Sequence, residues 1–147
     1  MIWNLQSSID ISDLSRLKSS CEDFSKQLKL DEIILLNGPL AAGKTEFVRQ
    51  LVEILCQSVV VKSPSYALHH EYFFNSKKID HWDLYRLQNE EELESVGFWD
   101  QLQNKNLIII EWAERLKTEW LPNQRKYFKV DIELSQSQRI LSIYQAA

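Results

Sequence analysis

The sequence has little of what marks membrane proteins, secreted proteins and proteins that bind metal through cysteines. It contains no apolar run near the roughly 18 residues that a membrane-spanning helix needs, and no signal peptide opens it. Its only two cysteines, Cys21 and Cys56, lack C-x-x-C spacing. A disulfide framework or a cysteine-ligated metal is therefore not expected, and we interpret both residues as reduced core thiols of a cytoplasmic protein without membrane contact.

A basic patch is missing as well. The formal net charge is −4, from 17 Lys and Arg against 21 Asp and Glu, without a block of Lys or Arg. Because binding to a nucleic-acid backbone needs a basic face, the chain is not expected to bind nucleic acid on its own. No linker, repeat or low-complexity segment divides the 147 residues, 44% of them hydrophobic, so we expect one globular domain over residues 1–147.

The sequence does contain a phosphate-binding loop. Residues Gly38 to Thr45 fit the pattern G-x-x-x-x-G-K-[ST]. The preceding segment, 32–36, is a short apolar run typical of a buried parallel strand. The following segment has apolar residues at helical spacing, namely Phe47, Val48, Leu51, Val52, Ile54 and Leu55. Strand, tight loop and helix are the order that this motif requires.

The composition of the loop suits a nucleoside triphosphate. Backbone N–H groups at a helix N-terminus bind phosphate oxygens, and Gly38 and Gly43 let the backbone turn and approach them without a Cβ in the way. Lys44 is predicted to reach the β- and γ-phosphates, and the Thr45 hydroxyl to ligate Mg²⁺. The predicted nucleotide-binding segment comprises Gly38, Pro39, Leu40, Ala41, Ala42, Gly43, Lys44, Thr45 and Glu46.

A carboxylate at a second strand end completes the predicted metal site. Four apolar residues, 107–110, run directly into Glu111. This is the Walker-B arrangement, which places a carboxylate beside the Mg²⁺ of the phosphate loop. The alternative is a glutamate that only begins the next helix.

Between these motifs lies a turn after a second predicted strand. Residues 59–62 are typical of a strand, and they end in the turn Ser63-Pro64-Ser65-Tyr66. Such a segment either senses the γ-phosphate in a nucleotide-driven protein or is an ordinary turn.

A β-hairpin is predicted next, with alternating strands over 67–74 and 78–84 and a polar tip at 75–77. On the returning strand His81 and Asp83 share a face. Asp83 lies at the strand end, where ligands of α/β sheets bind. No third ligand has the spacing of a zinc site.

The remaining segments complete the expected fold. They are an edge strand over 1–6, a helix from a cap at Ser12 or Asp13 to Leu28, an acidic helix over 88–103 broken at Gly97, a short helix over 113–120, and paired strands over 126–134 and 138–144. We therefore predict an α/β, P-loop NTPase-like three-layer sandwich. Its central sheet is mainly parallel, with an inserted β-hairpin and a C-terminal antiparallel strand pair.

The motifs together resemble the TsaE family, small bacterial P-loop ATPases required for threonylcarbamoyladenosine modification of tRNA. Four blocks agree in order and spacing from about Asp31 to Pro122: the phosphate loop, the S-P-S-Y turn, the H-W-D-L-Y-R block over 81–86, and the E-W pair over 111–112. The phosphate loop is common to many proteins, whereas the block over 81–86 followed by E-W is far more specific.

The resemblance implies a cofactor set, partners and roles. The loop would bind ATP, with Thr45 and Glu111 holding Mg²⁺ and with Lys44, Asp83 and Glu111 assisting hydrolysis. Ser65 would lie near the γ-phosphate, and Trp112 would pack beside the site. Members of the family act with TsaB and TsaD, so the TsaB–TsaD heterodimer is the implied partner, and tRNA is reached only through that complex.

Three loop residues depart from the usual family pattern G-D-L-G-A-G-K-T-T, namely Pro39, Ala41 and Glu46. Ala41 carries a methyl where glycine is usual, so a positive φ there would be strained. Glu46 adds a negative charge directly after the metal-binding hydroxyl. Two alternatives stand beside an ATPase. One is a small-molecule or nucleoside kinase, which is also built on a phosphate loop, and the other is a nucleotide-binding adaptor in which Ala41 and Glu46 mark lost turnover.

Overall fold

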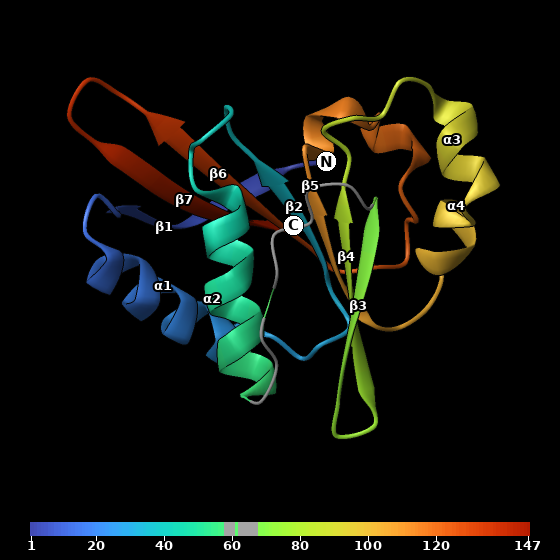
Figure 1. The fold of residues 1–147 in the computed structure, drawn as a ribbon, viewed down its shortest axis with the longest axis horizontal. Helices are drawn as coiled ribbons and strands as arrows, with labels where there is room; N and C mark the ends of the chain where they lie inside the picture. The colour runs from blue at the N-terminus through green and yellow to red at the C-terminus, as the bar shows by residue number, and fades with distance from the viewer. Residues whose placement is uncertain (58–60, 62–67) are drawn as a thin grey trace.

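A seven-stranded sheet forms the centre of the computed structural model, which describes residues 1–57, 61 and 68–147 (Figure 1). The strands lie in the order β1-β7-β6-β2-β5-β4-β3. Their bounds are β1 Trp3–Asp10, β2 Ile33–Asn37, β3 His69–Phe74, β4 Lys77–Asp83, β5 Leu107–Glu111, β6 Tyr127–Leu134 and β7 Arg139–Ala146. The strand predicted over 59–62 (Val61 apart) and the turn over 63–66, with Ser65, lie outside the described residues.

The middle of the sheet is parallel and its two sides are antiparallel. Strand β2 pairs in parallel with β5 and β6, and β5 pairs in parallel with β4. The β3–β4 hairpin adds one antiparallel side, while β7 and β1 add the other. Because parallel strands end at the same edge, β2, β4 and β5 bring Asn37, Asp83 and Glu111 to one edge of the sheet.

Helices cover both faces of the sheet, as Figure 1 shows. Helices α1 (Leu14–Gln27) and α2 (Lys44–Cys56) cover one face, and α3 (Glu90–Ser95) and α4 (Phe98–Gln101) the other. Successive β2 residues alternate between two apolar cores, with Ile34 and Leu36 facing α1 and α2, and Ile33 and Leu35 facing the opposite layer. This double burial explains the unbroken apolar run of β2 and confirms the predicted three-layer fold.

Local capping signals set the helix ends. The Asp13 side chain accepts a hydrogen bond from the Ser15 N–H and caps α1, while Asn89 caps α3 through the Glu92 N–H. Gly97 lies in the left-handed region, with φ of 73°, and separates α3 from α4. The cap of α1 at Asp13 and the division of the acidic helical segment at Gly97 agree with the sequence prediction.

Three elements differ from the prediction by more than a residue or two at an end, or in kind. Strand β1 extends to Asp10 because β7 pairs with it along its length. The hairpin tip is only Asn75 and Ser76, both at positive φ, because a two-residue turn of this kind fits the twist of the strands. The predicted helix over 113–120 is instead two 3-10 turns, Ala113–Arg115 and Thr118–Trp120, separated by the extended residues Leu116 and Lys117.

The described part of the chain contains no membrane-spanning helix and no exposed cysteine side chain. Among the described residues, no helix combines the length and the apolar character that crossing a membrane requires. Cys21 on α1 and Cys56 at the end of α2 are both buried in the core, and burial raises the pKa of Cys21 to about 12 and that of Cys56 to about 11. Both thiols are thus core groups, as predicted.

Candidate nucleotide site

The loop between β2 and α2 is bent as phosphate loops are. A Cβ on Gly38 would approach the Ile132 carbonyl oxygen to 2.8 Å, so no larger residue fits without movement. Gly43 has φ of 107° and directly precedes the first residue of α2. The first N–H groups of a helix have no partner within it, and here they directly follow the loop.

Ala41 has the positive φ for which the sequence suggested strain. Its φ is 62°, in the left-handed region where a Cβ costs about 1–2 kcal/mol. The next residue, Ala42, is buried, and its Cβ would lie 3.3 Å from a Cβ on Gly38. Leu40, in contrast, is exposed at the rim of the loop.

The Lys44 ammonium lies folded against the loop. It donates hydrogen bonds to the carbonyl oxygens of Gly38 and Pro39, the latter at 2.8 Å, and lies 3.9 Å from the centroid of the Trp112 ring. Burial lowers the pKa of Lys44, although the carboxylates of Glu114, Glu111 and Asp83 act in the opposite direction. A cation is therefore present at the position that a phosphate group would approach.

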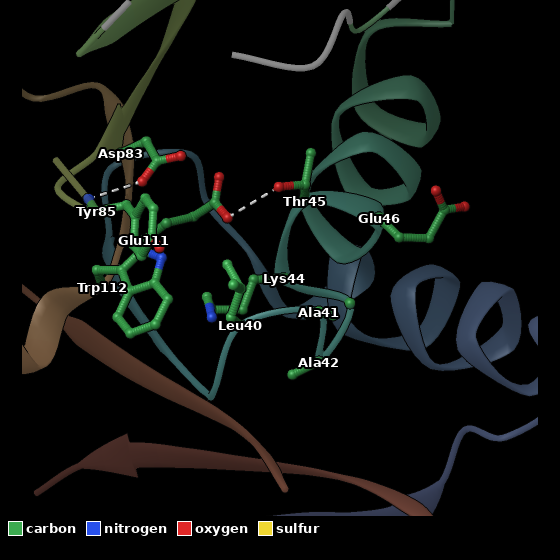
Figure 2. Close-up of a pocket in the computed structure, with 11 residues that line it drawn as sticks. Leu40, Ala41, Ala42, Lys44, Thr45, Glu46, Asp83, Tyr85, Glu111 and Trp112 are labelled. Carbon is green, nitrogen blue, oxygen red and sulfur yellow. Dashed lines mark hydrogen bonds between the residues drawn. The ribbon is translucent and has the colours of Figure 1, made fainter. Parts of the chain in front are cut away.

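Thr45 and Glu111 meet across the gap between α2 and β5. The Thr45 hydroxyl donates a hydrogen bond of 3.2 Å to Glu111 Oε1, and Figure 2 shows the two side chains pointing toward one another. Glu111 is only 1% exposed, and its second oxygen, Oε2, lies 2.6 Å from His81 Nε2. Two oxygen donors from distant parts of the chain thus lie within reach of one hard cation, and oxygen is the ligand that Mg²⁺ prefers.

Asp83 lies beside Glu111 at the same sheet edge. The two residues are direct partners in the parallel register of β4 and β5. Burial raises the pKa of the Asp83 carboxyl, and the Glu111 charge adds to the rise, whereas a hydrogen bond from the Tyr85 N–H opposes it. Two carboxylates with different environments are therefore available at this edge.

Glu46 lies near the loop but is directed along α2. Its carboxylate forms an ion pair with Arg49 and accepts a hydrogen bond of 3.0 Å from Gln50. The Arg49 bond is the main reason that the pKa of Glu46 is lowered. In Figure 2 the side chain points away from Thr45 and Glu111. Its charge is thus balanced by Arg49.

These residues enclose a cavity of about 260 Å³ at the end of the parallel strands (Figure 2). Its lining consists of Leu40, Ala41, Ala42, Gly43, Lys44, Thr45, Glu46, Asp83, Tyr85, Glu111 and Trp112. Gly38 and Pro39 contribute through their carbonyl bonds to Lys44. All the site residues predicted from the sequence are thus brought together, except Ser65, which lies outside the described residues.

Sequence reasoning missed two residues near the loop. His81 was placed on the face of Asp83 but was not connected with Glu111, because that contact depends on the register of β4 against β5. Arg139 at the start of β7 has a guanidinium nitrogen 3.2 Å from the position of a Cβ on Gly43. No local sequence pattern predicts that contact, because it depends on where the fold places the start of β7 relative to the loop.

Comparisons with known proteins relate the chain to one family. Residues 11–141 match the family model "Threonylcarbamoyl adenosine biosynthesis protein TsaE". The TsaE protein of Rickettsia conorii is 39% identical over 121 residues, which cover 81% of this chain and 67% of that protein. The Bacillus subtilis TsaE protein is 32% identical over 97 residues, covering 66% of this chain and 60% of that protein.

A solved structure has the same fold. The crystal structure of YdiB from Bacillus subtilis matches with a TM-score of 0.71, covering 100% of this chain and 89% of that one. The sequence identity is 19%, so this likeness speaks for the fold alone.

Proposed function

The chain belongs to the TsaE family of threonylcarbamoyl adenosine biosynthesis proteins, and on this premise we propose that it is a Mg²⁺-dependent ATPase, hydrolysing ATP to ADP and phosphate. The hydrolysis drives the TsaB–TsaD complex through its cycle in the threonylcarbamoyl modification of tRNA adenosine. One observation carries the proposal: the hydroxyl that follows the phosphate-loop lysine and the carboxylate that ends β5 are 3.2 Å apart.

The nucleotide is bound by the loop backbone, by Lys44 and through the two metal ligands. Backbone N–H groups of the loop and of the first turn of α2 bind the phosphates, whereas Pro39 has no N–H to donate. Thr45 and Glu111 would hold the Mg²⁺, which would supply charge neutralisation to the phosphate oxygens when bound. When the nucleotide binds, Lys44 gives up its hydrogen bonds to the Gly38 and Pro39 carbonyl oxygens and donates to phosphate oxygens instead. The exchange is favourable because hydrogen bonds from an ammonium to charged acceptors are stronger than those to neutral ones.

Asp83 orients the attacking water. Its carboxyl is half-buried beside Glu111, and its raised pKa makes it a better proton acceptor than an ordinary aspartate. Trp112 covers the Lys44 side of the cavity, and Ser65 is assigned to the γ-phosphate side by the family motif alone.

The partner and the compartment belong to the same proposal. A net charge of −4 supports contact with tRNA through the TsaB–TsaD heterodimer rather than directly. The two buried cysteines are compatible with a cytoplasmic location.

Hydrolysis of ATP by the purified chain, alone and with TsaB and TsaD, tests the proposal. The variants Thr45→Ala and Glu111→Gln should each reduce kcat by roughly 10²–10³-fold, because each removes charge stabilisation in the transition state. Thr118→Ala and Glu119→Gln, which change the same residue types on the second 3-10 turn, should leave the rate within about twofold.

Two results would contradict the proposal. Wild-type protein that hydrolyses no ATP in Mg²⁺, even with both partners present, would remove the activity itself. Full partner function in the Glu111→Gln variant together with its loss in Lys44→Ala would instead identify a nucleotide-binding adaptor.

A further inference from the structure

His81 is completely buried, and its shortest polar contact is with the carboxylate proposed to bind the metal. It lies on β4, 0% exposed, and its Nε2 atom is 2.6 Å from Glu111 Oε2. Its other ring nitrogen, Nδ1, is 3.5 Å from the Tyr72 hydroxyl, a much weaker contact. The imidazole therefore makes one strong hydrogen bond, directed at Glu111.

The two oxygens of Glu111 have different partners. Oε2 faces His81, behind the cavity, while Oε1 accepts the hydrogen bond from the Thr45 hydroxyl at the cavity wall. A carboxylate accepts hydrogen bonds only, so the ring must present Nε2–H to Oε2, and Nδ1 is then free to accept from the Tyr72 hydroxyl. This order gives every group in the line Tyr72–His81–Glu111–Thr45 a consistent donor and acceptor role.

We propose that His81 is a positioning residue for the metal site. Its Nε2–H bond fixes one oxygen of Glu111, so that the other oxygen takes the hydroxyl hydrogen of Thr45. With its hydrogen directed at Glu111, the Thr45 oxygen turns its lone pairs toward the cavity. The inference rests on the proposed function, because the cation that these oxygens receive is the Mg²⁺ of that proposal.

The physical need for such a residue follows from the ligands. A glutamate side chain has three rotatable bonds, and Mg²⁺ demands near-octahedral geometry, so an unfixed carboxylate must be ordered when the metal binds. Outer hydrogen-bond partners of metal ligands typically change metal affinity about 10–100-fold. His81 supplies this order before any metal is present.

Two side chains of similar size separate a positioning role from a packing role. In His81→Gln the side-chain amide nitrogen can take the place of Nε2, whereas in His81→Asn it reaches only the place of Nδ1. The first variant keeps the donor to Glu111 and the second loses it. His69→Gln is the matched control, because His69 lies on the same hairpin and bonds Asp80 instead of Glu111.

The measurement is Mn²⁺ binding to the full chain in the presence of ADP, followed by the electron paramagnetic resonance of free Mn²⁺. ADP affinity without metal, in EDTA, is measured alongside. His81→Asn should bind Mn²⁺ at least tenfold more weakly, His81→Gln within about threefold of wild type, and His69→Gln like wild type. ADP affinity in EDTA should stay within about twofold in all of them.

Each contrary result has a separate meaning. Equal Mn²⁺ affinity in wild type and His81→Asn would overturn the inference alone, and so would equal weakening by Gln and Asn or a parallel loss of ADP affinity in EDTA. Wild-type protein that binds no Mn²⁺ with ADP would overturn the proposed function and this inference with it.

The wild-type chain offers a readout that does not depend on how the variants fold. Nitrogen chemical shifts of the His81 ring report which nitrogen carries the proton. We expect a protonated Nε2 and an unprotonated Nδ1. The opposite tautomer would overturn the inference, because Nε2 could then not donate to Glu111.

Discussion

Ala41 stands in a backbone conformation that glycine adopts more easily. Its φ is 62°, and it belongs to a loop whose two glycines also have positive φ. The alanine keeps the loop shape and stores local strain beside the phosphate site.

Ala41→Gly should therefore stabilise the protein by about 0.5–1 kcal/mol, since relief of the left-handed strain exceeds the added freedom of the unfolded chain. Urea unfolding measures this. Ala42→Gly is the matched control: it removes a buried methyl at an ordinary φ and should destabilise by about 1–2 kcal/mol. Destabilisation by both changes would show that the strain at Ala41 is absent.

Asp80 gives the hairpin a defined dependence on pH. Burial alone would raise its pKa, but the His69 hydrogen bond, the Lys78 charge and the Asn106 amide together hold the pKa below its ordinary 3.8. A carboxyl with a lowered folded-state pKa stabilises the fold above the unfolded value, and this contribution is lost as pH falls through the folded one.

Asp80→Asn should cost about 1.5–3 kcal/mol at neutral pH and should remove part of the stability loss below about pH 4. Thermal unfolding across pH 2–7 checks this (the range spans roughly both pKa values). Glu71→Gln changes a more exposed partner of the same Lys78 and should cost no more than about 1 kcal/mol. Identical acid profiles for wild type and Asp80→Asn would refute the assignment.

The key site residues differ in how far local sequence could predict them. Lys44, Thr45 and Glu111 stand at fixed offsets from a glycine pair or an apolar strand, so short-range pattern was enough to bring them together. The bond between His81 and Glu111 depends on the register of β4 against β5, where Asp83 pairs with Glu111. Register between strands 30 residues apart is a tertiary property, and no local spacing encodes it.

Among the elements, the β3–β4 hairpin turns through two residues that both have positive φ. Asn75 and Ser76 have φ of 46° and 61°, and Asn tolerates such values better than Ser does. A two-residue turn with both φ positive strongly favours Asn-Gly.

Ser76→Gly should thus stabilise the chain by about 0.5–1 kcal/mol, measured by thermal or urea unfolding. Lys77→Gly, one residue later and within β4, should do the reverse by about the same amount, because glycine weakens a strand. A stabilising Lys77→Gly, or a neutral Ser76→Gly, would contradict the turn assignment.

Elements with strong local signals were predicted well. Strands β2 and β5 are apolar runs buried on both faces, and α1 and α3 have side-chain caps at Asp13 and Asn89. Strand β1 was predicted too short, since its polar second half is held by pairing with β7 rather than by its own composition.

At the scale of the whole molecule, the fold and the site are coupled through ligand binding. The nucleotide cavity joins β4, β5 and the start of α2, whose apolar faces enter both cores. A ligand that binds only the folded chain must therefore raise its stability.

Mg²⁺ and ADP at about 100 times Kd should stabilise the wild type by about 2.7 kcal/mol, a rise in Tm of roughly 5–10 °C. Differential scanning fluorimetry measures the shift. Lys44→Ala should lose most of it. Lys117→Ala is the matched control, because Lys117 also lies over a tryptophan ring, that of Trp120. It should keep the full shift, because Lys117 does not line the cavity. An undiminished shift in Lys44→Ala would contradict the phosphate-binding role.

The most direct test of the shared metal site is a crystal structure of the chain with ADP and Mn²⁺, with the anomalous signal of the metal recorded. The account predicts one strong peak at coordination distance from the Thr45 hydroxyl oxygen, about 2.1 Å for an ion like Mg²⁺, joined to Glu111 directly or through one water. Among the described residues, His69, Glu71 and Asp80 also lie close enough together to share a metal ion. A peak at that cluster, with none between Thr45 and Glu111, would contradict the account.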